Sequence, residues 1–358
     1  MLTKDPLKNK RIFVGFNSAG AAGIYAFTRA LKRRGYQIDF YGLNRTNFNM
    51  PVDFLLRFSS NPYLAFFQRI KYFFQILPKY DVWHFNYMDV FFFYPLNLLI
   101  LKVLGKKIIC TFRGADVRSK VDILSYDLFS KSKKTWPKYF ENLYVKENIF
   151  KKIKRTLRMK IFCALSDKIV LTGPFLVSSV DCFDKIIPYA RDIKYLEKIP
   201  TKKHRLTVVH APTAFDVKGT YYVKQAFKNL KKKYSQVDFK IITGLSHDDL
   251  LKELANGDII VDQLIVGWYG GLAAEAMVMG KVVLANLNPV YFQFVDFSKQ
   301  LPVYNTNVWQ LENDLEMLIN SPEERNLRSA RGAKFAKKYH DCQKVANQYL
   351  ELYRGSDE

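Results

Sequence analysis

The sequence has few cysteines and few histidines, and this scarcity excludes several classes of protein. Its four cysteines, Cys110, Cys163, Cys182 and Cys342, lie far apart among 358 residues and form no CxxC pair. Such spacing is typical neither of a disulfide framework nor of a zinc site. We therefore expect four reduced, partly buried thiols, as in a cytosolic protein. No Asp-x-Asp segment between apolar strands indicates a divalent-metal site either.

Long hydrophobic runs are also missing. The longest lies near residues 90–101 and is interrupted by Pro95 and Asn97, so it falls short of the roughly 20 residues that span a bilayer. The segment Met1–Lys10 is charged and leads straight into an apolar strand, which argues against a signal peptide. We expect a cytoplasmic protein that is soluble or bound to a membrane surface.

Acidic side chains are too few to balance the basic ones. The chain has 56 Lys and Arg against 33 Asp and Glu, a net charge of +23. Residues 1–200 hold 35 basic and 15 acidic side chains, a net charge of +20, whereas residues 201–358 hold 21 and 18, a net charge of +3. This asymmetry predicts two domains with different roles, one of which meets nucleic acid, an anionic membrane or a phosphorylated substrate.

Hydrophobic residues make up 49% of the chain, which is enough for a large core and excludes disorder. They form short apolar strands separated by loops and helices, a rhythm typical of parallel, doubly wound sheets. The expected strands are 11–16, 37–41, 81–85, 107–112 and 168–172, then 207–210, 238–243, 258–261 and 281–285. We predict an α/β fold of two domains, residues 1–199 and 200–337, followed by a C-terminal helix at 338–358 that packs back on the first domain. Two such domains facing a cleft would place a ligand at the carboxyl ends of the strands.

The most informative segment runs from Asp258 to Val283. A strand enters the glycine-rich turn Gly267-Trp-Tyr-Gly-Gly271 and then a helix that carries Glu275. Backbone N–H groups at such a helix start favour phosphate oxygens, and Glu275 can accept hydrogen bonds from two vicinal hydroxyls of a ribose. The alternative is a solvated glutamate behind an ordinary tight turn.

A second segment carries a lysine and a glycine at the end of a strand. It reads His210-Ala-Pro-Thr213, then Asp216-Val-Lys218-Gly219-Thr220. A Lys-Gly pair in such a loop suits a diphosphate, because glycine lets the backbone approach it closely. The alternative is again a solvated turn.

Together these segments resemble the donor half of GT-B glycosyltransferases of the retaining family four, of the bacterial surface-polysaccharide type. The segments that carry the resemblance are His-Ala-Pro-Thr…Lys-Gly-Thr and Asp-Gln-Leu…Gly-Trp-Tyr-Gly…Ala-Glu-Ala-Met…Gly-Lys-Val-Val. In the first half, Asp81-Val-Trp-His-Phe85 and Thr111-Phe-Arg-Gly-Ala-Asp-Val-Arg118 fit the same order. The likeness covers most of the chain and is strongest over residues 205–290.

The resemblance implies two Rossmann-like domains, the first binding the acceptor and the second the nucleotide-sugar donor. It implies that Glu275 holds the nucleotide ribose and that Lys218, with Gly219, contacts the donor diphosphate. It places Tyr269, Gly270, Gly271 and Leu272 against the phosphate and sugar, Gly244 beside the base, and Gly20, Gly23 and Asn86 at the acceptor and phosphate loops. It also implies transfer with retention and without a metal or other cofactor, the nucleotide-diphosphate sugar being a co-substrate.

The chain departs from the family pattern at three places. Gly267 stands where the family often has a glutamate that contacts the donor sugar, and Asn86 replaces the second histidine of a His-x-His pattern. The stretch Ala214-Phe-Asp216 lacks the arginine that often precedes the lysine. Two alternatives therefore stay open, a non-catalytic GT-B-like protein that binds nucleotide or glycan, and a GT-B sugar-nucleotide epimerase.

The candidate catalytic residues lie in the first half. His84 could contact the transferred sugar or the acceptor, or it could be a core histidine bonded to the backbone. Asp116 could bind the acceptor or organise its loop, or it could be an Asx-turn residue paired with an arginine. Arg113 could help to hold the diphosphate.

Two segments of the first half predict basic amphipathic helices. Apolar residues recur at helical spacing beside cations, which is typical of helices that bind an anionic membrane surface. The apolar positions are Phe66, Phe67, Ile70, Phe73, Phe74 and Leu77 in the first segment, and Ile149, Phe150, Ile153 and Leu157 in the second. The alternative is that both stripes pack on the sheet and their lysines are solvated. No nucleic-acid-binding module is recognisable, so we expect no nucleic-acid partner.

The resemblance to GT-B glycosyltransferases implies a hexosyltransferase-type enzyme of surface polysaccharide biosynthesis. We expect it to use a glycan or lipid-linked acceptor and to lie at the inner face of the cytoplasmic membrane.

Overall fold

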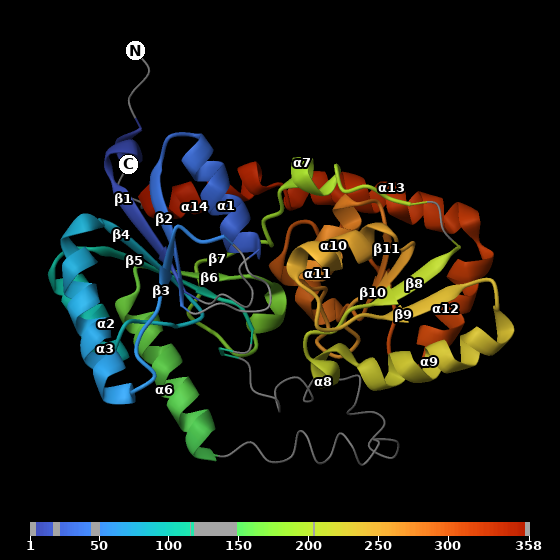
Figure 1. The fold of residues 1–358 in the computed structure, drawn as a ribbon, viewed down its shortest axis with the longest axis horizontal. Helices are drawn as coiled ribbons and strands as arrows, with labels where there is room; N and C mark the ends of the chain where they lie inside the picture. The colour runs from blue at the N-terminus through green and yellow to red at the C-terminus, as the bar shows by residue number, and fades with distance from the viewer. Residues whose placement is uncertain are drawn as a thin grey trace. The chain divides into compact units, whose positions relative to one another are not determined.

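The structure is a computed structural model and describes residues 5–16, 22–43, 51–114, 116–117, 149–202 and 205–354. The chain divides into two compact units (Figure 1). Among the described residues, unit 1 holds those up to 117, then 149–190 and those from 342 onward, and unit 2 holds those from 191 to 341. Among the described residues, the chain passes between the units after residues 190 and 341. The boundaries expected from the sequence lie after residues 199 and 337.

Unit 1 is built on a seven-stranded parallel sheet with the order β3-β2-β1-β4-β5-β6-β7. Its strands are β1 (Arg11–Gly15), β2 (Gln37–Leu43), β3 (Phe54–Leu56), β4 (Val82–Asn86), β5 (Lys107–Phe112), β6 (Lys168–Leu171) and β7 (Lys185–Ile186). Its helices are α1 (Ala22–Arg33), α2 (Pro62–Ile76), α3 (Tyr94–Val103), α6 (Ile149–Leu165) and α14 (Cys342–Arg354). Short 3₁₀ helices lie at Pro6–Asn9, Leu77–Lys79 and Pro174–Leu176.

Both faces of this sheet are buried, because its central strands are apolar at nearly every position. Ile12 and Val14 of β1 belong to a core with the inner faces of α1 and α14, including Phe27 and Tyr349. Phe13, between them, points to the other face and packs on aromatic rings such as Trp83, at a centroid distance of 4.6 Å. The last helix of the chain is therefore part of the unit 1 core.

Unit 2 contains a five-stranded parallel sheet with the order β12-β11-β10-β8-β9. Its strands are β8 (Thr207–His210), β9 (Asp238–Ile241), β10 (Ile259–Val261), β11 (Val282–Ala285) and β12 (Tyr304–Asn305). Its helices are α7 (Ile193–Leu196), α8 (Phe215–Lys218), α9 (Thr220–Lys233), α10 (His247–Ala255), α11 (Gly271–Val278), α12 (Leu311–Asn320) and α13 (Pro322–Tyr339). Two 3₁₀ helices, η5 (Pro289–Phe294) and η6 (Ser298–Gln300), follow β11.

The core of unit 2 lies between its sheet and the apolar sides of α9 and α12. Val208, Val261 and Leu284 of the sheet belong to one buried cluster with Leu230 of α9 and Leu315 of α12. Helix α11 is buried from Ala273 to Val278, so almost only its first turn, Gly271 and Leu272, lies partly open. This arrangement places the start of α11 at the carboxyl edge of the sheet.

The expected α/β class and the parallel sheets are confirmed. The prediction of four reduced thiols is wrong, because Cys163 of α6 and Cys182 before β7 form a disulfide with their Cα atoms 5.9 Å apart. Local spacing could not indicate this pair, because Cys163 lies on α6 and Cys182 on the loop before β7, and only the tertiary fold brings them together. Cys110 and Cys342 are buried free thiols. Within the described ranges, no helix combines the length and hydrophobicity needed to cross a bilayer.

Candidate functional site

The site in unit 2 gathers around the first turn of α11. Gly270 is the N-cap residue of this helix and has no side chain to accept a hydrogen bond from the exposed N–H groups. The carboxylate of Asp262, the first residue after β10, instead accepts a hydrogen bond from the backbone N–H of Gly270 itself, at 2.5 Å from its Oδ2, so the N–H groups of the first turn are left for a ligand. A β-carbon at position 270 would lie 3.1 Å from Asp262 Oδ2, so this approach favours glycine.

Lys218 meets the same carboxylate. Its Nζ lies 2.5 Å from Asp262 Oδ1, and the two side chains are only 12% and 0% exposed. The ammonium group also lies 3.1 Å from where a β-carbon of Gly270 would be. The structure therefore places Lys218 at the start of α11, where the sequence predicted a diphosphate contact, and pairs it with a carboxylate.

Glu275, one turn into α11, is held by two side chains from other segments. Its Oε1 lies 3.1 Å from Arg191 Nε and accepts a hydrogen bond from His247 Nε2 at 3.0 Å. Burial alone would raise the pKa of the Glu275 carboxyl, but the Arg191 guanidinium and the His247 hydrogen bond outweigh it and hold this pKa below its usual value. The solvated alternative is thus excluded, because Glu275 is 4% exposed and ionised. Both of these contacts use Oε1, and Oε2 makes no ion pair or hydrogen bond with the described residues.

Arg191 and His340 brace the same helix start from the two places where the chain passes between units. Arg191 also donates from Nη2 to the carbonyl of Gly271 at 2.8 Å. Its backbone N–H donates to the carbonyl of His340 at 2.6 Å, and the ring of His340 bonds the Tyr269 hydroxyl at 3.1 Å. The loop before α11 is therefore fixed by residues that the sequence analysis did not select.

Three glycines in the loops of unit 2 adopt backbone conformations that side chains rarely tolerate. Gly219, between α8 and α9, has φ of 74°, and Gly244 after β9 has φ of 76°. Gly267 has φ of 77° and packs against Asn288 and Tyr291, with only 3.1 Å available for a β-carbon. The position where the family often has a glutamate is thus a closed turn in this chain. Tyr269 is 1% exposed and stacked on Trp268, so among the four predicted loop residues Gly271 and Leu272 are the partly exposed ones.

In unit 1, the structure places His84 within the core. It is 0% exposed, with its Nδ1 at 2.7 Å from the Tyr353 hydroxyl and its Nε2 at 2.7 Å from Thr111 Oγ1. Burial, together with the charge of Arg113, lowers the pKa of His84 to about 3. His84 is therefore a core histidine, as the second interpretation of the sequence had it, but it bonds to side chains and not to the backbone. Neither ring nitrogen is left for a substrate.

Asp116 likewise organises its own loop. Its carboxylate accepts hydrogen bonds from the backbone N–H groups of Arg113 and Gly114, and burial raises its pKa against the effect of these bonds. The same contacts fix the backbone of Arg113, whose side chain stays partly exposed after β5. Asp116 therefore adopts the turn role that the sequence left open.

Two of the three residues that the resemblance assigned to the acceptor and phosphate loops are buried in unit 1, and the third is not described. Asn86 ends β4, is 1% exposed, and its Nδ2 has no hydrogen-bond partner among the described residues. Gly23 is buried in the first turn of α1. Gly20 falls outside the described residues.

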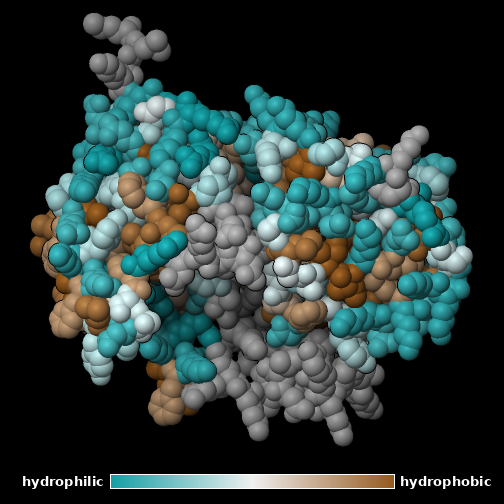
Figure 2. Space-filling model, viewed as in Figure 1, coloured by the Kyte–Doolittle hydropathy of each residue, from teal (hydrophilic) through white to brown (hydrophobic). Residues whose placement is uncertain are grey.

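The two basic helices of unit 1 leave much of their apolar stripes exposed. On α2, Phe73 is 0% exposed, but Phe67 is 65% exposed. On α6, all four predicted apolar positions are exposed, from 52% at Leu157 to 76% at Phe150. Figure 2 shows hydrophobic residues gathered on unit 1 where Figure 1 places α2 and α3, and again at the N-terminal end of α6. The alternative that both stripes pack on the sheet is therefore wrong for α6 and holds only in part for α2.

No group of three or more His, Cys, Asp or Glu side chains in the described part of the chain is arranged to hold a metal ion. The charged side chains at the start of α11 are paired with one another, as Lys218 with Asp262 and Arg191 with Glu275. What this arrangement offers a ligand is the first N–H groups of α11, a lysine and one carboxylate oxygen. These are groups that bind phosphate and hydroxyl oxygens.

Sequence patterns did not predict the contacts that four residues make around the start of α11: Asp262, Arg191, His247 and His340. Asp262 could have been found, because it directly follows an apolar strand at the edge where ligands bind. The other three carry no local signal, since each reaches the start of α11 from a distant segment.

No family model and no curated protein sequence matches the chain. Among solved structures, it is similar to sucrose-phosphate synthase from Thermosynechococcus elongatus, with a TM-score of 0.62, 15% identity and coverage of 96% of this chain and 98% of that one. It is also similar to HepE from Anabaena in complex with UDP-glucose, with a TM-score of 0.62, 12% identity and coverage of 96% and 99%.

A putative UDP-N-acetylglucosamine 2-epimerase from Listeria monocytogenes is similar as well, with a TM-score of 0.56, 12% identity and coverage of 95% and 94%. At these identities the likeness concerns the fold. The two parallel sheets and the full-length similarity agree with the fold that the loop motifs predicted, and the chain has the GT-B fold of nucleotide-sugar glycosyltransferases.

Proposed function

We propose that the chain is a glycosyltransferase that moves a sugar, with retention, from a nucleotide-diphosphate donor to a glycan or lipid-linked acceptor. The observation that carries the proposal is the convergence of Lys218, the start of α11 and Glu275 at one edge of the unit 2 sheet. A structure of the same fold, that of HepE, holds UDP-glucose, which supports a donor of that class.

In this proposal, Glu275 Oε2 accepts hydrogen bonds from the ribose hydroxyls while Oε1 stays with Arg191 and His247. The first N–H groups of α11 and the Lys218 ammonium stabilise the charge that develops on the leaving diphosphate. The leaving diphosphate itself helps to remove the acceptor proton, as the family resemblance implies. No metal is assigned a role, so transfer should persist in excess EDTA.

Glu275 gives the sharpest test of this assignment. A panel of UDP-, GDP- and ADP-sugars is screened by thermal shift, and any stabilising donor is titrated by calorimetry against the wild type, E275Q and E275A. The amide of E275Q loses the ionised acceptor for the ribose hydroxyls, so we expect at least tenfold weaker donor binding. The control is E323Q, which removes an exposed glutamate from the same unit and should bind as the wild type does. Wild-type affinity in both Glu275 variants, or no shift with any donor, would refute the donor site.

An epimerase is the second candidate, because an enzyme named for that activity has the same fold. The two activities differ in what happens to a bound donor without acceptor. An epimerase converts the sugar of the donor on its own, whereas a transferase consumes the donor only slowly by hydrolysis. NMR of the donor incubated with protein alone therefore separates them, and a new sugar-nucleotide signal would replace the transferase proposal.

We further propose that unit 1 binds an anionic membrane surface, in surface polysaccharide biosynthesis at the inner face of the cytoplasmic membrane. The support is the exposed apolar stripe of α6, with Phe150 76% and Ile153 57% exposed, beside the exposed lysines 151, 152, 154 and 160. Helix α3, which also exposes apolar residues, packs on α6. An apolar stripe flanked by cations suits an interfacial helix.

Sedimentation with vesicles tests this surface. Binding should require phosphatidylglycerol and should weaken about thirtyfold in K151Q/K154Q, because each lysine near an anionic surface contributes about 1 kcal/mol. F150S/I153S should also lose binding, whereas V290S/F294S, which alters exposed apolar residues of unit 2, should not. Equal binding to phosphatidylcholine vesicles, or none to either kind, would contradict the membrane role.

A further inference from the structure

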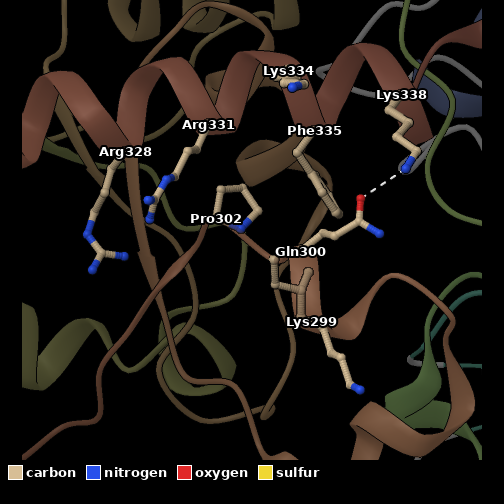
Figure 3. A pocket seen from close by; sticks show the side chains of 9 residues that line it. Lys299, Gln300, Pro302, Arg328, Arg331, Lys334, Phe335 and Lys338 are labelled. Atoms are coloured by element: carbon tan, nitrogen blue, oxygen red, sulfur yellow. Dashed lines mark hydrogen bonds between the residues drawn. The ribbon is translucent and has the colours of Figure 1, made fainter.

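A basic pocket lies in unit 2 between α13 and the segment around η6, outside the site at α11. Its volume is about 440 Å³, within the range of small-molecule sites. Nine residues line it: Lys299, Gln300, Leu301, Pro302, Arg328, Arg331, Lys334, Phe335 and Lys338. Five of them are cations and none is acidic. Figure 3 shows Arg328 and Arg331 reaching from α13 on the side of Pro302, with Phe335 between the helix and Gln300.

The two outer cations of the row on α13 are fixed in place. Arg328 Nε lies 2.6 Å from Glu324 Oε1, and its guanidinium stacks on the ring of Tyr304 at 4.4 Å. Lys338 Nζ donates to Gln300 Oε1 at 2.9 Å. Groups that are already ordered lose less conformational freedom when a ligand binds.

The two cations between them have no counter-charge in the part of the chain that the structure describes. Neither Arg331 nor Lys334 makes an ion pair or hydrogen bond with the described residues. Both belong to α13, and residues three apart rise about 4.5 Å along a helix axis. Like charges at this spacing repel one another, so an anion between them would relieve a repulsion that the protein alone leaves in place.

The position of these cations within α13 is informative. Lysines in the last turn of a helix, such as Lys337 and Lys338, are favoured by the helix dipole. Arg328 and Arg331 lie in the middle of an 18-residue helix, where the dipole gives no such advantage. The helix dipole therefore does not account for Arg328 and Arg331.

The floor of the pocket is apolar. Phe335 is 4% exposed, and Pro302 is buried beside it. A bare inorganic ion would leave this floor uncovered, whereas a ligand with a neutral part could lie against it. The residues thus fit a phosphorylated molecule of sugar-phosphate or nucleotide size better than a lone phosphate.

We propose that this pocket is a second ligand site, which binds a phosphate group between Arg331 and Lys334 and covers Pro302 and Phe335 with the rest of the ligand. The phosphate could belong to a soluble metabolite or to a lipid headgroup, and the two sources share this chemistry.

The test uses the full chain and a matched pair of double variants. R331Q/K334Q removes the two unpaired cations, and K231Q/K232Q removes two exposed lysines from the end of α9 in the same unit. Ribose 5-phosphate, a sugar monophosphate whose ring can cover the apolar floor, is the soluble probe and is titrated by calorimetry, and phosphatidylglycerol vesicles are used in sedimentation. The α11 site is intact in both variants and the wild type, so a difference between them reports on the pocket alone.

We expect R331Q/K334Q to bind ribose 5-phosphate at least tenfold more weakly than the wild type, with K231Q/K232Q unchanged. A selective loss of vesicle binding with unchanged ribose 5-phosphate affinity would support the site and assign its phosphate to a lipid headgroup. Equal behaviour of the two double variants with both probes would overturn the proposal.

Discussion

The carboxyl edges of the two sheets use polar side chains in opposite ways. In unit 2, Lys218, Asp262 and Glu275 meet other segments around the first turn of α11, where two residues stay partly exposed. In unit 1, His84 and Asp116 satisfy the hydrogen-bonding groups of their own core and loop. The difference follows from position, because His84 is the third residue of β4 and faces a packed helix layer, whereas Asp262 comes after the last residue of β10.

The largest expected effect tests whether the unit 2 side chains depend on one another. D262A leaves the nearly buried Lys218 ammonium and the Gly270 N–H without their acceptor, so the free energy of unfolding should fall by about 3–5 kcal/mol. The loss of unfolding free energy in the double variant K218A/D262A should be smaller, by at least about 1 kcal/mol, than the sum of the losses in K218A and D262A. Urea unfolding measures all three.

The exposed pair Lys240–Glu253, at 3.2 Å, is the matched control. Its removal should cost less than about 1 kcal/mol. Strict additivity at Lys218 and Asp262 would mean that the two residues act independently.

Among the described residues, unit 1 has a disulfide bond and unit 2 has none. The disulfide between Cys163 and Cys182 spans 19 positions, and removing such a cross-link typically lowers stability by about 3 kcal/mol. C163S/C182S should therefore unfold at lower urea than the wild type, and dithiothreitol should lower the wild type to the level of the variant. A count of four free thiols in the unreduced protein would show that the bond is absent in solution.

The smallest effect concerns pH. Burial lowers the pKa of His84 to about 3 and that of His210 to about 4, from 6.5. The unfolded chain then binds more protons than the folded one below about pH 6.5, so stability is present above that pH and is lost as the pH falls. Each histidine contributes a slope of about 1.4 kcal/mol per pH unit.

Unfolding of H84Q and the wild type between pH 7 and 5 isolates the unit 1 contribution. The variant should be less stable at pH 7 and should have the shallower slope. Parallel slopes would mean that His84 is not buried as a neutral ring.

The fold and the residues around the start of α11 were largely predictable from sequence, and the partners of these residues were not. Strand and glycine patterns are local, so they located Lys218, the loop before α11 and Glu275. Arg191, His247 and His340 reach that loop through the tertiary fold, and the Cys163–Cys182 pair forms in the same way. His84 illustrates the opposite error, because a histidine in a strand near a binding edge looks the same in sequence whether it faces a ligand or the core.

The pairing at the start of α11 also predicts how ionic strength acts on the protein. Two cations and two carboxylates nearly cancel there, so a diphosphate would be selected by hydrogen-bond geometry, and its affinity should change little with added salt. The pocket on α13 carries five cations without a lining carboxylate, and screening over a Debye length of about 8 Å at physiological ionic strength would weaken it steeply. Salt concentration should therefore separate the two sites on a single chain.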